Sequence, residues 1–252
     1  MDIWTPESIS IIAMTFLLAG LIKGIVGLGL PTVSLSLLAV TIGLKSGMAL
    51  MLFPSLFTNI WQAAVGGRFE RILARLWTLI LPACIGIWFG AGVLARADAL
   101  LVSAFFGILL CLYSAISLTM PQIPPPGRAE GWLSPLVGSI TGLTMGFTGS
   151  FIMPGVLYLQ ALGLSKDELV QAMGITFGSC LIALTISLAG HSLLPKELII
   201  ASLAAVVPSF VGMAVGQKIR KALSEDRFRQ ALFFALLIIG VYLIVRAALI
   251  GL

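Results

Sequence analysis

The sequence GLIKGIVGLGLPTVS, Gly20 to Ser34, decides the architecture. It lies in the middle of an apolar run that extends from about residue 9 to about residue 44. A straight helix of that length would measure about 50 Å, whereas the hydrocarbon core of a bilayer is about 30 Å thick. Glycines allow the backbone to turn, and Pro31 suits the first turn of a new helix. The run therefore predicts two shorter helices that meet at an irregular turn.

A second stretch, GSITGLTMGFTGSFIMPG from Gly138 to Gly155, repeats these features inside another long apolar run. Residues of one type also recur at spacings of 123 to 129 along the chain. The pairs are Pro31 with Pro154, Ala49 with Ala172, Gly67 with Gly190, Gly86 with Gly212, Gly90 with Gly216, and Tyr113 with Tyr242. This pattern predicts two repeats, residues 1–120 and 132–252, joined by a proline-rich linker at 121–131 within one integrated membrane domain.

The composition places the surface of this chain in lipid. Of the 252 residues, 59% are hydrophobic and 10% are charged, whereas globular domains carry about 25% charged residues. The charges gather between apolar runs that are long enough to cross a bilayer. The net charge of +5 comes from basic residues that flank these runs, without a basic face bearing aromatic residues, so a nucleic-acid partner is not expected.

The distribution of basic residues predicts the orientation of the runs, because cytoplasmic loops are enriched in Lys and Arg. One basic cluster follows the second run of the first repeat, and another follows the third run of the second repeat. Both can face the cytoplasm only if each broken run enters the membrane and returns; the alternative is that the asymmetry is accidental. The clusters are Arg68, Arg71 and Arg75, and Lys218, Arg220, Lys221, Arg227 and Arg229.

We therefore expect an all-α integral membrane protein, a polytopic helical bundle of two inverted repeats. Each repeat would contain a broken or re-entrant helical hairpin followed by three transmembrane helices, and both termini would be periplasmic. Secondary transporters with inverted repeats bind their substrates near the bilayer midplane, at discontinuous helices.

The two breaks are the candidate binding site, because backbone N–H groups at a helix start attract anions. The alternative for Gly20, Gly24, Gly138 and Gly142 is helix packing, since small residues four apart let membrane helices approach closely. The candidate substrate-binding residues are Lys23, Gly24, Gly27, Gly29, Pro31 and Thr32 at the first break, Thr148, Gly149, Ser150 and Pro154 at the second, and Asn59, Gln62 and Ser179 in the following runs.

Lys23 is the most informative candidate, because an ammonium group within a membrane segment is costly and by default marks function. It could provide a point charge for an anion, or it could extend to the membrane interface. Asn59 and Gln62 are three residues apart and share a helix face. Their amides could contact a ligand or hold helices together.

The sequence gives little support to functions other than transport. No Asp or Glu lies within an apolar run, and no nucleophile with a base or metal-binding motif is present, so we expect no enzyme, cofactor or metal site. An exporter of anions could use the membrane potential alone, which provides about 2.3 kcal/mol per charge at 100 mV. The predicted partners are a small anion and the lipid bilayer, and a homodimer remains open because GxxxG-like faces serve folding and dimerisation alike.

The doubled hairpin, GLIKGIVGLGLPTVSL and GLTMGFTGSFIMPGVLYLQALGLS, together with the basic GGRFE stretch at 66–70, resembles the TauE/SafE family of sulfite exporters. The resemblance implies export of sulfite or organosulfonates such as sulfoacetate across a bacterial inner membrane. An ion-coupled uptake carrier for a sulfur oxyanion and a non-transport membrane scaffold are the alternative functions.

Overall fold

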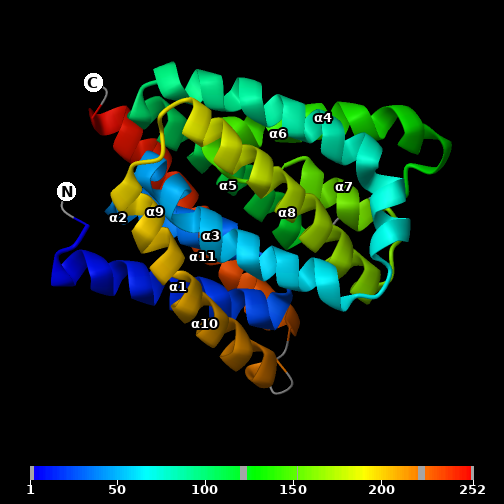
Figure 1. Ribbon diagram of the computed structural model, residues 1–252, viewed down its shortest axis with the longest axis horizontal. Helices are drawn as coiled ribbons and strands as arrows, with labels where there is room; N and C mark the ends of the chain where they lie inside the picture. Colours follow the sequence, from blue (N-terminus) through cyan, green and yellow to red (C-terminus); the bar gives the residue numbers. More distant parts are fainter. Residues whose placement is uncertain (1–2, 120–123, 152, 221–224, 251–252) are drawn as a thin grey trace. The chain divides into compact units, whose positions relative to one another are not determined.

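The computed structural model describes residues 3–119, 124–151, 153–220 and 225–250, and these residues form helices without any β-strand (Figure 1). Seven segments within them are long and apolar enough to cross a membrane, which confirms the expected all-helical membrane protein. The helices are α1 (Pro6–Val26), α2 (Leu30–Thr41), α3 (Leu44–Val65), α4 (Phe69–Arg96), α5 (Ala99–Thr119), η1 (Gly127–Ala129), α6 (Glu130–Thr148), α7 (Gly155–Ala161), α8 (Lys166–Gly190), α9 (Lys196–Ala204), α10 (Val206–Ile219) and α11 (Glu225–Ile250).

Both predicted breaks are confirmed as interruptions between two helices. α1 ends at Gly27 with φ of 84°, and α2 begins after Gly29 with φ of 102°. Glycine adopts these left-handed conformations without a steric penalty. The second break runs from Gly149, with φ of 79°, to Pro154. The return of each hairpin within the membrane stays a prediction.

The chain folds into two compact units. Unit 1 comprises Met1–Pro54, Asp98–Met120 and Leu193–Leu252, and unit 2 comprises Ser55–Ala97 and Pro121–Ser192. Each unit thus combines segments from both predicted repeats. Of the predicted linker, residues 121–123 lie outside the described residues, as does Lys221 of the second basic cluster.

Close contacts between small residues hold unit 1 together. α1 packs along α10, where a Cβ atom added to Gly20 would lie 2.2 Å from the carbonyl oxygen of Ser209. Gly24 faces α10 one turn further on. α5 and α11 meet where Gly107 and Gly240 each lie against the other's carbonyl oxygen. Only residues without side chains permit such an approach of two helix backbones.

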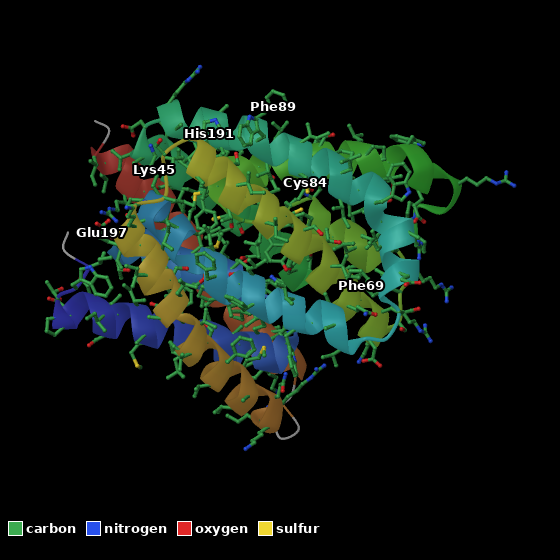
Figure 2. All side chains as sticks on the ribbon, in the orientation of Figure 1. Lys45, Phe69, Cys84, Phe89, His191 and Glu197 are labelled. Atoms are coloured by element: carbon green, nitrogen blue, oxygen red, sulfur yellow. The ribbon has the colours of Figure 1, made fainter. Side chains whose placement is uncertain are left out.

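Unit 2 contains a similar glycine-lined contact between α4 and α6. Added Cβ atoms at Gly138 and Gly142 would lie 2.2 Å and 2.1 Å from carbonyl oxygens of α4. The packing interpretation of the four glycines at 20, 24, 138 and 142 is therefore confirmed. The outward side of α4 is apolar, and Phe89, which is 63% exposed, lies on it (Figure 2). An apolar exposed side is what a lipid-facing helix requires.

α3 continues through Pro54 because another helix compensates for the proline. A helical proline removes the N–H that would bond to the carbonyl four residues earlier, which here belongs to Leu50. The hydroxyl of Ser202 on α9 donates to the Leu50 carbonyl at 2.7 Å and accepts the Phe53 N–H at 3.2 Å. All four residues belong to unit 1.

Prolines and caps set the other helix ends. α9 ends at Ala204, and α10 begins two residues later. Pro208 accounts for the interruption, because a proline has no N–H to donate to the Ala204 carbonyl four residues earlier. α8 begins with a capping box, in which Ser165 and Glu168 each accept a hydrogen bond from the other's backbone N–H. The apolar segment Lys196–Ile219 thus consists of two helices separated by one residue.

Candidate functional site

The first break presents a buried cation beside a turn of the backbone. Lys23 lies in the last turn of α1 and is 3% exposed, and among the described residues it is the only buried charged residue. Its carbonyl accepts the Gly27 N–H at 2.7 Å. Extension of the ammonium to the membrane interface requires an exposed side chain, so the burial of Lys23 disfavours that alternative.

The start of α2 lies directly after this turn and has no side-chain cap. Its N-cap residue is Gly29, which has no side chain that could accept a hydrogen bond from the first turn. Pro31 lacks an N–H, while Thr32 in the same turn retains one. Because the N–H groups of a first helical turn have no intrahelical partner, an uncapped start leaves them available to an anion.

The second break is lined by hydroxyl groups. Thr148 Oγ1 donates to the Thr144 carbonyl at 2.7 Å and accepts the Ser150 N–H at 3.3 Å. The hydroxyl of Ser150 is buried and has no hydrogen-bond partner among the described residues. Gly149 makes the turn, and Pro154 precedes α7.

Three further buried hydroxyls of unit 2 lack a hydrogen-bond partner within the described chain, those of Ser55 on α3 and of Thr176 and Ser187 on α8. The rings of Phe151 and Phe177 lie 4.7 Å apart, which brings the second break next to α8 near Thr176. Buried polar groups normally have a partner in the protein or in water. These hydroxyls are therefore suited to bind a ligand or water.

The sequence-based set omits Ser55, Thr176 and Ser187. The available signal is that all three are polar residues within long apolar runs. That signal does not separate them from other hydroxyl residues of the same runs, such as Thr185, which bonds to the carbonyl of Leu181 in the preceding turn.

The remaining predicted residues of unit 2 lie on or near contacts of α8. Gly174 packs against the Asn59 carbonyl and the Cβ atom of Gln62. Ser179 is half-buried, and its carbonyl faces the Cys84 thiol of α4 at 3.9 Å (Figure 2). A different amide connects the helices here, since Gln171 donates to the Ala63 carbonyl at 2.8 Å and accepts the Arg68 N–H at 3.1 Å.

The predicted set thus divides between the two units. Unit 1 holds the group around the first break, and unit 2 holds the group around the second break and α8. Among the described residues, no cluster of three His, Cys, Asp or Glu side chains could hold a metal ion. The groups at the two breaks provide hydrogen-bond donors and, at the first break, one positive charge. The two groups are Lys23, Gly24, Gly27, Gly29, Pro31 and Thr32, and Asn59, Gln62, Thr148, Gly149, Ser150, Pro154 and Ser179.

A comparison with protein families matches residues 12–243 to the sulfite exporter TauE/SafE model. Searches of curated proteins and of solved structures returned no match. The family match covers both helix breaks and nearly the whole chain, and it agrees with the seven apolar segments. The chain therefore belongs to the TauE/SafE family of membrane sulfite exporters.

Proposed function

We propose that this protein exports small sulfur-containing anions, sulfite or organosulfonates such as sulfoacetate, from the cytoplasm across a bacterial inner membrane. The anion would bind at the glycine-rich helix breaks near the midplane. The observation that carries this proposal is the buried Lys23 in the last turn of α1, which is followed by the uncapped start of α2.

The first break is the stronger anion site of the two. The partial positive charge of a helix start comes from aligned peptide dipoles, and α2 has 12 residues whereas α7 has 7. Lys23 adds a full charge, and the second break adds hydroxyl groups. A sulfite or sulfonate group has several oxygens that accept hydrogen bonds, so both kinds of group suit it.

The absence of buried carboxylates among the described residues favours export driven by the membrane potential. Proton-coupled carriers relay protons through carboxyl or histidine groups inside the membrane. One negative charge leaving a cell at 100 mV, negative inside, releases about 2.3 kcal/mol. That free energy supports roughly a forty-fold gradient, because each 1.4 kcal/mol corresponds to a factor of ten.

Helix packing supports the proposed inverted repeats, in which α4 and α10 are equivalent. Gly86 and Gly90 of α4 contact α6, and Gly212 and Gly216 of α10 contact α1. Each of these helices therefore packs on the broken helix of the other repeat. α5 and α11 would be equivalent as well, and their glycines contact each other reciprocally, as expected beside a two-fold axis.

The test is anion efflux from proteoliposomes loaded with sulfite, sulfoacetate, sulfate or chloride under an imposed membrane potential. We expect wild-type protein to release the sulfur anions and Lys23→Ala to lose this release. Lys196→Ala removes an exposed lysine at the start of α9 and should retain it. Efflux that persists in Lys23→Ala would refute the first break as the site.

The same assay separates the two alternative functions. Flux that requires added sodium or a pH gradient would indicate the ion-coupled uptake carrier. Complete absence of flux in protein that is folded by size-exclusion chromatography, under every gradient, would favour the scaffold.

A further inference from the structure

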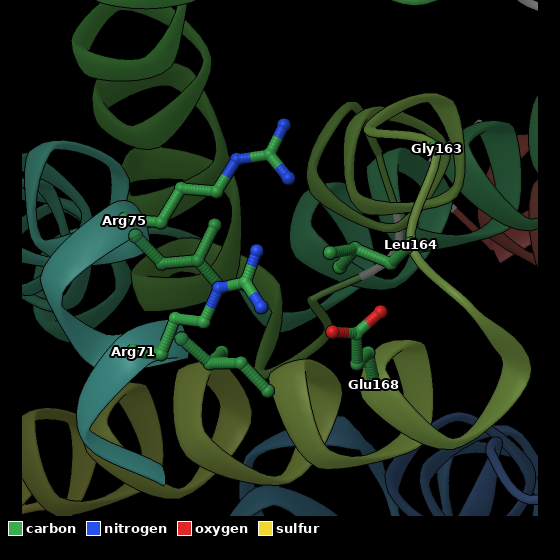
Figure 3. Close-up of a pocket in the computed structure, with 7 residues that line it drawn as sticks. Arg71, Arg75, Gly163, Leu164 and Glu168 are labelled. Carbon is green, nitrogen blue, oxygen red and sulfur yellow. The ribbon is translucent and has the colours of Figure 1, made fainter. Parts of the chain in front are cut away.

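A basic pocket lies in unit 2, between α4 and α8. It has a volume of about 220 Å³ and is lined by Arg71, Ile72, Arg75 and Leu76 of α4, by Gly163 and Leu164, and by Glu168 of α8. Figure 3 shows both guanidinium groups extending from α4 toward the Gly163–Leu164 turn, with the Glu168 carboxylate beyond them.

Ion pairs neutralise all but one of the charges around this pocket. Arg75 donates two hydrogen bonds to Glu130, at 2.7 and 2.8 Å, and a third to the Leu162 carbonyl at 3.2 Å. Glu168 pairs with Arg68. Within the described residues, Arg71 forms no ion pair, so it leaves the pocket with one unbalanced positive charge.

The pocket lies at the depth of the lipid headgroups. The 28 residues of α4 measure about 42 Å, about 12 Å more than the hydrocarbon core. The ends of α4 must therefore extend into the headgroup layers, and its first two turns carry Arg71 and Arg75. The same turns expose Leu73, and the next turn exposes Trp77. Tryptophan is enriched at membrane interfaces.

We propose that this pocket binds the headgroup phosphate of an anionic phospholipid. Arginine binds phosphate through two parallel hydrogen bonds, and a phosphodiester carries the single negative charge that Arg71 leaves unbalanced. The fixed Arg75 provides a second positive group. The apolar wall of Ile72, Leu76 and Leu164 suits a lipid better than a free ion, because a free ion is hydrated on all sides.

Native mass spectrometry of the protein extracted from mixed phosphatidylglycerol and phosphatidylethanolamine vesicles tests this site. We expect one phosphatidylglycerol to remain bound to the wild type, and about fivefold lower occupancy in Arg71→Ala, since a basic residue near the surface contributes about this factor. Arg96→Ala removes an exposed arginine at the other end of α4 and should leave occupancy unchanged. Arg71→Gln provides a second variant, which keeps a polar side chain but removes the charge.

The proposal is overturned if wild type retains no phosphatidylglycerol, or if Arg71→Ala and Arg96→Ala lower its occupancy equally. A second measurement distinguishes a lipid from a free ion with the same chemistry. Delipidated protein is titrated with inorganic phosphate while its melting temperature is recorded. Stabilisation by inorganic phosphate that depends on Arg71 would show a site for a free oxyanion and would refute the lipid.

Discussion

The hydroxyl of Ser202 should contribute measurably to stability because it bonds to a carbonyl that Pro54 leaves without a helical partner. Ser202→Ala removes a 2.7 Å hydrogen bond to the Leu50 carbonyl from a site where Ser202 is 0% exposed. A buried polar group without a partner costs about 1–3 kcal/mol. Side-chain hydrogen bonds between membrane helices average only about 0.6 kcal/mol, but here Pro54 provides no N–H to replace the bond that the Leu50 carbonyl loses.

We therefore expect Ser202→Ala to cost about 1–3 kcal/mol, which lowers the melting temperature by about 2–12 °C in a protein of this size. Fluorescence-detected unfolding of the purified protein in detergent measures this change in melting temperature. Ser209→Ala is the matched control, because Ser209 is equally buried. Its hydroxyl donates to the Ala205 carbonyl, which also accepts the Ser209 N–H, so no carbonyl is left without a partner.

A double-mutant cycle with Pro54→Ala isolates the cause. Alanine at position 54 restores the N–H that can bond to the Leu50 carbonyl, so Ser202→Ala should cost much less in that background. An equal cost of Ser202→Ala with and without Pro54 would refute compensation of the proline as the role of this serine.

Two further changes test the packing and the charges of unit 2. Gly142→Ala places a Cβ atom 2.1 Å from the Ala83 carbonyl oxygen, about 1.3 Å short of the 3.4 Å where ordinary contact begins, and should cost about 1–3 kcal/mol in thermal unfolding. Gly131→Ala on the same helix meets nothing within 4 Å and should not destabilise; equal melting temperatures of the two variants would contradict the contact. The hydrogen bonds from Arg75 lower the pKa of Glu130 below its ordinary value of 4.5. This pair therefore stabilises the fold above pH 4.5 and loses its effect as the pH falls through the lowered pKa. Because it is partly exposed, Arg75→Ala should cost no more than about 1 kcal/mol at pH 7 and less in acid, and a cost that grows in acid would contradict this sign.

The sequence predicts the two helix breaks because they depend on local properties. An apolar run that is longer than the bilayer is thick, and that contains glycines followed by a proline, is most simply formed by two helices with a turn between them. Lys23 is equally visible, since it is the one charge well inside an apolar run. The structure confirms the breaks and buries Lys23.

The partners of each helix could not be predicted, because the same small-residue pattern occurs on several helices. Glycines four apart lie on α1, α4, α6, α8 and α10, so the pattern allows any pairing among them. The structure selects α1 with α10 and α4 with α6. The bond between Ser202 and Leu50 joins residues 152 apart in the chain, and no local pattern predicts it.

The buried charge of Lys23 links the binding of an anion to the stability of the fold. A cation enclosed by protein loses its hydration, and this cost is not fully recovered from protein groups in general. A bound anion would offset part of this cost, so sulfite should raise the unfolding temperature of wild type. Lys23→Met removes the charge and keeps most of the side-chain length, and it should lose both this stabilisation by sulfite and the efflux of sulfur anions. A variant that sulfite stabilises as strongly as wild type would refute the role of Lys23 in binding.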